Sequence, residues 1–168
     1  MRPAGRPYCA LMKALVQRVS RGSVAVKGQK VGEIGRGFVV LLGVRHGDAE
    51  KDAAHLAEKT AGLRVFADEN DKMNRSLQDV GGAVLVVSQF TLYADTRKGN
   101  RPSFINAAPP ELAEALYTSY TGHLRRLLGD ERVRTGIFRA DMSVEIINDG
   151  PVTIELTTDR QPADAGPA

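Results

Sequence analysis

Cysteine, tryptophan and the other aromatic residues are scarce in this chain of 168 residues, and each scarcity narrows the possible chemistry. Cys9 is the only cysteine, which excludes a disulfide framework, a cysteine-based metal site and a redox pair of thiols. Tryptophan is absent and aromatic residues make up 5% of the sequence, so we expect a core of Val, Leu, Ile and Ala side chains. The 17 glycines favour tight turns, which suit strands better than a helical bundle.

Histidine is also rare, and none of the three histidines lies in a segment typical of an active site: His46, His55 and His123. Ser-His-Asp and Cys-His sites need an imidazole as proton shuttle, so neither is expected here. Zinc-ligand spacings and glycine-rich phosphate loops are missing as well. The acidic residues 68–71 favour a solvated turn over a Ca²⁺ loop, because the glycine at the sixth position of such a loop is absent.

The net charge is small, since 23 Lys and Arg residues face 20 Asp and Glu residues. A protein that grips a long duplex usually has a clustered basic face, so we expect at most a short, mostly single-stranded nucleic-acid end as partner. No apolar run approaches a membrane span and no signal peptide is visible, which predicts a cytosolic protein without membrane contact. We expect one domain at residues 12–158, a dispensable extension at 1–11 and a disordered tail at 159–168.

Apolar patterning predicts an α+β protein. Residues 37–44 and 83–87 are continuous apolar runs and should be buried strands, and the alternating residues 13–34 should form a hairpin that turns at Gly28 and Gln29. Helices are predicted at residues 49–63 and about 110–128, and two final strands at 142–147 and 152–156. The apolar face of the second helix should hold Leu112, Leu116, Tyr120, Leu124 and Leu127. We therefore expect a single curled, mostly antiparallel or mixed sheet, barrel-like, with two main helices on its outer face.

Two polar segments have compositions that no simple structural need explains. Residues 88–92, S-Q-F-T-L, place hydroxyls and an amide at the end of the most β-prone run, where irregular backbone can present free N–H groups. Residues 148–153, N-D-G-P-V-T, place Gly-Pro between two predicted strands. The structural alternatives are a strand-end turn for the first segment and a hairpin turn for the second.

Both segments, in this order, resemble those of the D-aminoacyl-tRNA deacylase family. The similarity spans nearly all of residues 12–156. Its further motifs are Q-R-V at 17–19, V-G-E-I-G at 31–35, K-M-N at 72–74, G-N-R-P-S-F at 99–104 and T-G-x-F-x-A-D-M at 135–142. A single G-P-V-T would be a weak signal, whereas this set is specific.

The resemblance implies a hydrolase without cofactor that cleaves the ester of D-aminoacyl-tRNA, and of glycyl-tRNA mischarged on tRNA(Ala), and rejects L-aminoacyl-tRNA. It implies a homodimer that binds the aminoacylated 3′ end of tRNA at interface sites. Each site would be completed by a cis Gly-Pro pair, Gly150 and Pro151 of the partner subunit, whose carbonyls contact the α-amino group and Cα of the amino acid. Arg18 should brace this motif, with a structural salt bridge as the alternative.

The same resemblance assigns the site residues. Ser88, Gln89, Phe90 and Thr91 are the catalytic candidates, with backbone N–H groups around Gln89 and Phe90 stabilising the oxyanion. Phe138 should line the pocket with Phe90, and Met142 should lie beside the adenine. We expect neither a metal nor a covalent intermediate. The alternatives are an acyl-enzyme on Thr91, which lacks an adjacent base, and a non-catalytic dimer that binds RNA ends or nucleotides.

Arg139 departs from the resemblance, because the family usually carries a small residue between Phe138 and Ala140. Its side chain either extends over the rim toward the terminal adenosine or faces solvent. The departure bears on affinity for the tRNA end and not on the chemistry.

Overall fold

The structure, a computed structural model, describes residues 12–158, so the expectations for residues 1–11 and 159–168 lie outside the described residues. In chain order the strands are β1 (Lys13–Val26), β2 (Gln29–Ile34), β3 (Gly37–Gly43), β4 (Phe66–Ala67), β5 (Met73–Arg75), β6 (Ala83–Ser88), β7 (Val133–Thr135) and β8 (Met142–Thr157). The α-helices are α1 (Glu50–Gly62), α2 (Leu77–Val80) and α3 (Pro110–Leu128), and the 3₁₀ turns are η1 (Phe90–Tyr93) and η2 (Asp130–Arg132).

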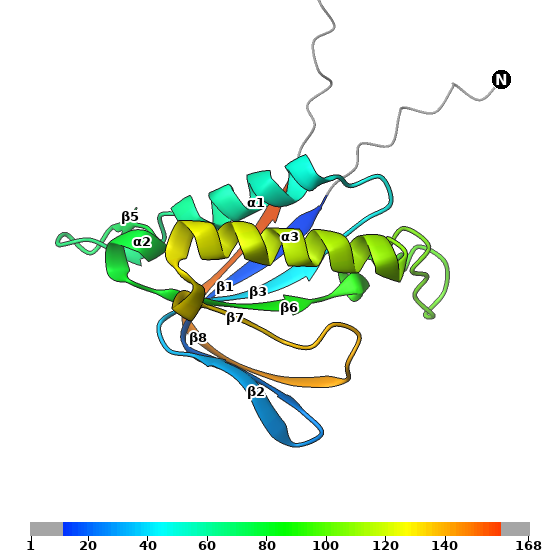
Figure 1. The fold of residues 1–168 in the computed structure, drawn as a ribbon, viewed down its shortest axis with the longest axis horizontal. Coiled ribbons are helices and arrows are strands. Elements are labelled where there is room, and N and C mark those ends of the chain that lie inside the picture. The colour runs from blue at the N-terminus through cyan, green and yellow to red at the C-terminus, as the bar shows by residue number, and fades with distance from the viewer. Residues whose placement is uncertain (1–11, 159–168) are drawn as a thin grey trace, which may run out of the picture.

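β1 is the strand that joins the two halves of the main sheet. One edge of β1 pairs antiparallel with β3 along residues 13–19 and with β2 along residues 22–26, and its other edge pairs antiparallel with β8. The sheet continues from β3 through β6 to β7 in parallel. Helices α1 and α3 lie side by side over one face, while β2 and the first part of β8 curl away from them (Figure 1). This six-stranded mixed, barrel-like sheet confirms the predicted α+β fold, and β4 and β5 form a separate two-stranded sheet beside the single sheet that the sequence predicts.

β3 and β6 are buried on both faces, which explains their continuous apolar runs. Phe38, Val40 and Leu42 of β3 belong to the core cluster that includes the side chains of α1 and α3. Val39 packs in a second cluster on the opposite face, and Leu85 of β6 joins it there. A strand that is covered on both sides has no solvent-facing positions, so it carries no polar alternation.

The two main helices begin and end within a residue of their predicted bounds. The helical spacing that predicts α1 consists of Ala53, Leu56, Ala57, Thr60 and Leu63. The first four are buried, whereas Leu63 follows the end of the helix and is half-buried. The predicted face of α3 is wrong at one position: Leu127 is 38% exposed, whereas Leu128 is buried. The buried stripe of α3 includes Tyr117 and Thr121, so it is rotated toward the positions that follow the predicted ones. Among residues 12–158, no helix combines the length and the apolar character that a membrane crossing requires.

Two turn predictions need correction. The β1–β2 turn is formed by Lys27 and Gly28, one residue earlier than expected, and both residues have positive φ angles, as a tight two-residue hairpin turn requires. Residues 148–153 do not form a hairpin turn between two strands. β8 pairs with β1 on both sides of this segment, so residues 149–152 form a bulge in one continuous strand.

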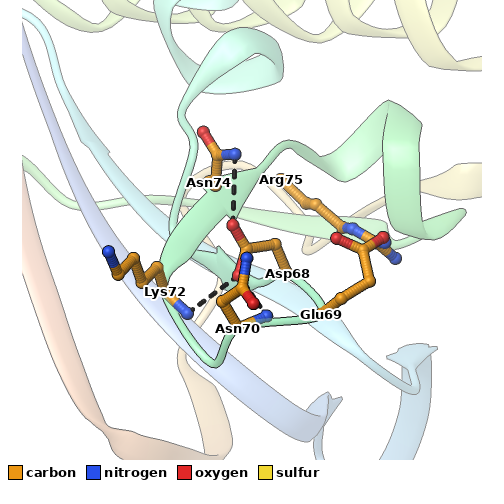
Figure 2. A network of polar contacts seen from close by, with 6 residues as sticks. All are labelled: Asp68, Glu69, Asn70, Lys72, Asn74 and Arg75. Carbon is orange, nitrogen blue, oxygen red and sulfur yellow. Dashed lines mark hydrogen bonds and ion pairs between the residues drawn. The ribbon is translucent and has the colours of Figure 1, made fainter.

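The acidic residues 68–71 lie in the turn of the small β4–β5 hairpin (Figure 2). The carboxylate of Asp68 accepts hydrogen bonds from the backbone N–H groups of Asn70 and Lys72, at 2.8 and 3.0 Å, and from the amide of Asn74 at 3.2 Å. These bonds, the one from Lys72 first, lower the pKa of Asp68. The carboxylate thus organises its own turn, in agreement with the turn interpretation.

Tyr120 provides a test of the packing between the two main helices. Its buried hydroxyl lies 2.7 Å from the hydroxyl of Thr60 on α1, which itself donates to the carbonyl of Leu56. Tyr120→Phe should therefore lower the free energy of unfolding by about 1 kcal/mol at pH 7, measured by urea denaturation followed by circular dichroism.

The same variant should behave differently in alkali. Burial raises the pKa of Tyr120, so above about pH 10 the unfolded chain releases a phenolic proton that the folded chain keeps, and stability falls as the pH rises. Removing this phenol should make the alkaline decline shallower. An equally steep decline in wild type and Tyr120→Phe would contradict this assignment.

Candidate active site

A pocket of about 560 Å³ opens where the end of β6, η1, the start of α3 and residues 138–144 meet, and its size is typical of a small-molecule site. The structure brings together five of the nine residues that the sequence analysis assigns to the site. Those in the pocket wall are Ser88, Gln89, Phe90, Phe138 and Met142. The other four, which line no part of this pocket in their own chain, are Arg18, Thr91, Gly150 and Pro151.

The backbone at the end of β6 determines which N–H groups face the pocket region. Ser88 is the last β6 residue in register with β3, and the N–H of Gln89 donates to the carbonyl of Leu42 at 2.8 Å. This N–H is therefore occupied, which corrects the expectation that it stabilises an oxyanion. The next two residues, Phe90 and Thr91, open η1, and the first N–H groups of such a turn have no partner within it.

The side chains of Gln89 and Thr91 bond to each other, because the Gln89 amide donates to the Thr91 hydroxyl. No carboxylate or imidazole lines the pocket within the described part of the chain. His123 does not line the pocket, and its Nε2 lies 3.0 Å from a carboxylate oxygen of Glu50 on α1. The Thr91 hydroxyl thus lacks an adjacent proton acceptor.

Aromatic side chains form the apolar part of the wall. Phe90, 57% exposed, meets Phe104 edge-on with ring centroids 5.1 Å apart. Phe138 packs against Tyr117 at 5.9 Å, and the Tyr117 hydroxyl donates to the carbonyl of Val86 at 3.0 Å. Burial raises the pKa of Tyr117, so this phenol stays neutral and supports the wall without carrying charge.

Arg139 is the one ionisable side chain in the pocket wall as far as the described residues go. Its φ angle of 65° lies in the left-handed region, which few residues other than glycine and asparagine adopt. The residue is exposed and also lines the pocket, so both alternatives raised by the sequence, extension toward the terminal adenosine and exposure to solvent, stay open.

The Gly150–Pro151 bulge is exposed, and a side chain of β1 holds it in place. The peptide bond between the two residues is cis, and Gly150 has a φ angle of 126°, which favours glycine. Arg18 lies opposite the bulge, where its Nε donates to the carbonyl of Asp149 at 3.0 Å and lies 3.6 Å from the Asp149 carboxylate. Its Nη1 donates to the carbonyl of Val65. Arg18 therefore combines the bracing contact and the ion pair.

Three contributors escaped the residue-level sequence analysis. The side chain of Gln17 accepts hydrogen bonds from the amide of Asn148 and, at 2.9 Å, from the hydroxyl of Thr153, so it closes the base of the bulge. The side-chain amide oxygen of Asn148, Oδ1, accepts from the backbone N–H of Val152 at 3.2 Å. Phe104 completes the aromatic wall. All three lie inside the motifs Q-R-V, N-D-G-P-V-T and G-N-R-P-S-F, so the signal was present in the sequence.

Comparison with known proteins shows the family. The family model described as D-Tyr-tRNA(Tyr) deacylase matches residues 15–157. A D-aminoacyl-tRNA deacylase of Anaeromyxobacter dehalogenans (strain 2CP-C) is 58% identical over 149 residues, which cover 89% of this chain and 99% of the relative. One of Roseiflexus sp. (strain RS-1) is 59% identical over 145 residues, which cover 86% of this chain and 92% of the relative.

Two solved structures share the fold. A structure described as c-Myc DNA Unwinding Element Binding Protein has a TM-score of 0.81 at 48% identity and covers 86% of this chain and 97% of its own. A probable eukaryotic D-amino acid tRNA deacylase has a TM-score of 0.75 at 19% identity, covering 88% and 99%, and supports the fold alone. With a family model that spans almost all described residues and relatives more than half identical, this chain belongs to the D-Tyr-tRNA(Tyr) deacylase family.

Proposed function

We propose that this chain hydrolyses the ester bond of D-aminoacyl-tRNA and releases a free D-amino acid and tRNA in the cytoplasm, where charged tRNA is used. The observation that carries the proposal is the pocket at the end of β6, whose apolar wall includes Phe90, the residue whose N–H opens η1 and has no partner within that turn. Such a site suits an activated ester, because it offers donors to a developing oxyanion without needing a protein nucleophile.

Catalysis is assigned to backbone donors and to the substrate itself. The N–H groups of Phe90 and Thr91 would stabilise the oxyanion, and a donor of this kind contributes roughly 3–4 kcal/mol in other hydrolases. The ribose 2′-OH next to the ester would deliver or polarise the attacking water. Phe90 and Phe138 would line the pocket with Met142 beside the adenine, and Ser88 and Gln89 would shape its polar end.

Chiral selection is assigned to Gly150 and Pro151. Both are exposed and do not line the pocket at the end of β6 in their own chain, so they are available to a second copy. In a homodimer, their carbonyls would enter the pocket of the other chain and lie against the Cα of the amino acid. The contacts from Arg18 and Gln17 support this role, because a selecting surface must hold its position when the wrong enantiomer enters.

The rival mechanism, an acyl-enzyme on Thr91, is disfavoured by the surroundings of that hydroxyl. It accepts a bond from Gln89 and has no adjacent base. A second function is suggested by the 48% identical structure described as a DNA unwinding element binding protein. Duplex DNA binding by the purified chain, measured beside turnover of D-aminoacyl-tRNA, would separate the two functions.

Thr91→Ala should retain most of the hydrolysis of D-Tyr-tRNA, because alanine keeps the backbone N–H that we assign to catalysis. Loss of a true nucleophile would cost on the order of 10⁴-fold or more. A substrate that ends in 2′-deoxyadenosine should be cleaved about 100-fold more slowly or worse, as expected when a general acid–base group is lost. Abolished turnover in a folded Thr91→Ala protein would establish the nucleophile mechanism instead.

A matched pair at Phe90 isolates the backbone donor. Phe90→Ala and Phe90→Pro both remove the ring, but only proline removes the N–H, and the first position of a helical turn accepts proline. The proline variant should be about 100-fold slower than the alanine variant in single-turnover assays. Equal rates would exclude this N–H as an oxyanion donor.

D-Tyr-tRNA should be hydrolysed and L-Tyr-tRNA left almost intact, whereas Gly-tRNA, including glycine mischarged on tRNA(Ala), should be cleaved. Carbonyls held against Cα leave room for hydrogen where an L residue carries its side chain, and glycine has hydrogen on both sides. Such a clash should discriminate more strongly than the roughly 200-fold reached by one methylene in a fitted pocket. Parallel deacylation assays measure the three rates. Comparable rates for both Tyr enantiomers would refute exclusion by the bulge.

The chain should be a dimer whose selectivity depends on the second copy. Upon dilution, the ratio of D-Tyr-tRNA to L-Tyr-tRNA hydrolysis should fall in step with dissociation, measured by analytical ultracentrifugation with a fluorescent label. A monomer that retains full activity and full selectivity would show that each site is complete within one chain.

A further inference from the structure

The loop between η1 and α3, residues 95–106, is exposed yet firmly anchored. Asp95 and Ser103 pair across its base through two backbone hydrogen bonds of 2.7 and 2.9 Å. The N–H of His46 donates to the carbonyl of Asn106 at 3.3 Å, and Ala107 pairs with Arg45. Its Phe104 ring lies against Phe90 of the pocket wall. The loop therefore has a defined position directly beside the candidate active site.

The charge of this loop is strongly asymmetric. It contains three cationic side chains, Arg97, Lys98 and Arg101, and one carboxylate, Asp95. Arg97 pairs with Asp95 at 2.5 Å, and the hydrogen bond from its guanidinium is the main reason why the pKa of Asp95 falls to about 2. Within residues 12–158, Lys98 and Arg101 have no carboxylate within 4.0 Å. These two cations are thus exposed and form no ion pair with a carboxylate among the described residues.

The surface around these charges is hollowed on two sides. One hollow of about 510 Å³ is lined by Lys98, Arg101 and Ser103. A second hollow of about 540 Å³ adds the cationic Lys13 and Arg45 to the same region. Asp95, Arg97 and Ile105 line both hollows and form the wall between them. Three basic side chains of the loop and two from neighbouring segments therefore gather in this region, although the whole chain has a net charge of only +3.

We propose that this loop, through Lys98 and Arg101, binds backbone phosphates of the tRNA acceptor end while the terminal aminoacyl-adenosine occupies the neighbouring pocket. The inference rests on the proposed function, which places an ester attached to a polyanion in that pocket. Exposed, uncompensated Lys and Arg residues are the groups that neutralise phosphates, and such contacts position a nucleic acid without reading its sequence. The loop supplies affinity for RNA that an apolar, nearly uncharged pocket cannot.

The test compares two variants that lose the same charge. Lys98→Ala/Arg101→Ala removes two cations from the loop, and Lys51→Ala/Lys59→Ala removes two exposed cations from α1. Binding of fluorescent, deacylated tRNA, which carries no amino acid, is measured by anisotropy at several salt concentrations. The loop variant should bind roughly tenfold more weakly at low salt, and the slope of log K against log salt should shrink by about 0.7–0.9 for each lost phosphate contact. The α1 variant should match wild type.

Two outcomes would overturn the proposal. Equal losses in both double variants would show that tRNA responds only to net charge, and unchanged affinity and salt slope in the loop variant would exclude the phosphate contacts. Far-UV circular dichroism confirms that each variant is folded, and the single variants Lys98→Ala and Arg101→Ala provide an independent pair if the double variant is unstable. Deacylated tRNA has no ester to cleave, so the binding assay does not depend on catalysis. Failure of wild type to cleave D-Tyr-tRNA would therefore refute the proposed function and not this binding surface.

Discussion

The pairing of β3 with β6, buried on both faces, is the constraint on which the candidate site depends. Core side chains cover these two strands from both sides, so their ladder is rigid up to its last rung. That rung is the bond from the Gln89 N–H to the carbonyl of Leu42. One residue later the chain enters η1, whose first N–H groups have no partner within the turn, and Phe90 at its start lines the pocket. A well-packed ladder thereby fixes the position of unpaired donors, which is the preorganisation that oxyanion stabilisation requires.

The bulge in β8 is also fixed in position, by polar contacts in place of apolar packing. Residues 149–152 lose their ladder bonds to β1, and side chains of β1 replace them: Arg18 bonds the carbonyl of Asp149, and Gln17 bonds Asn148 and Thr153. These hydrogen bonds from β1 hold the bulge in one conformation, which an exposed glycine and proline could not do by themselves. The result is a projecting surface of defined shape on the outside of one chain.

Charge is divided between the two parts of the proposed substrate site. The pocket wall contains a single ionisable side chain, Arg139, among the described residues, so the chemistry there depends on backbone dipoles and on the substrate. The neighbouring loop carries uncompensated Lys98 and Arg101. Phosphate contacts act at long range and depend on salt, whereas an oxyanion donor acts at one atom, so separating them lets affinity and chemistry be set independently.

The sequence by itself determined the fold class, both main helices, the buried strands β3 and β6 and the family, because periodic burial and contiguous motifs are local signals. It also located the pocket residues Phe90, Phe138 and Met142.

Tertiary structure decided the features that local sequence signals do not encode. The N–H of Gln89 donates a hydrogen bond to the carbonyl of Leu42, a residue distant in the sequence. The G-P segment is a bulge and not a turn, because one long strand, β1, pairs with β8 on both sides of it. The sequence already shows three cations in the loop at 95–106, but only the tertiary structure adds Lys13 and Arg45 from other segments to the same surface. Hydrogen-bond partners and charge clusters are properties of spatial neighbours, and only the packed chain defines those neighbours.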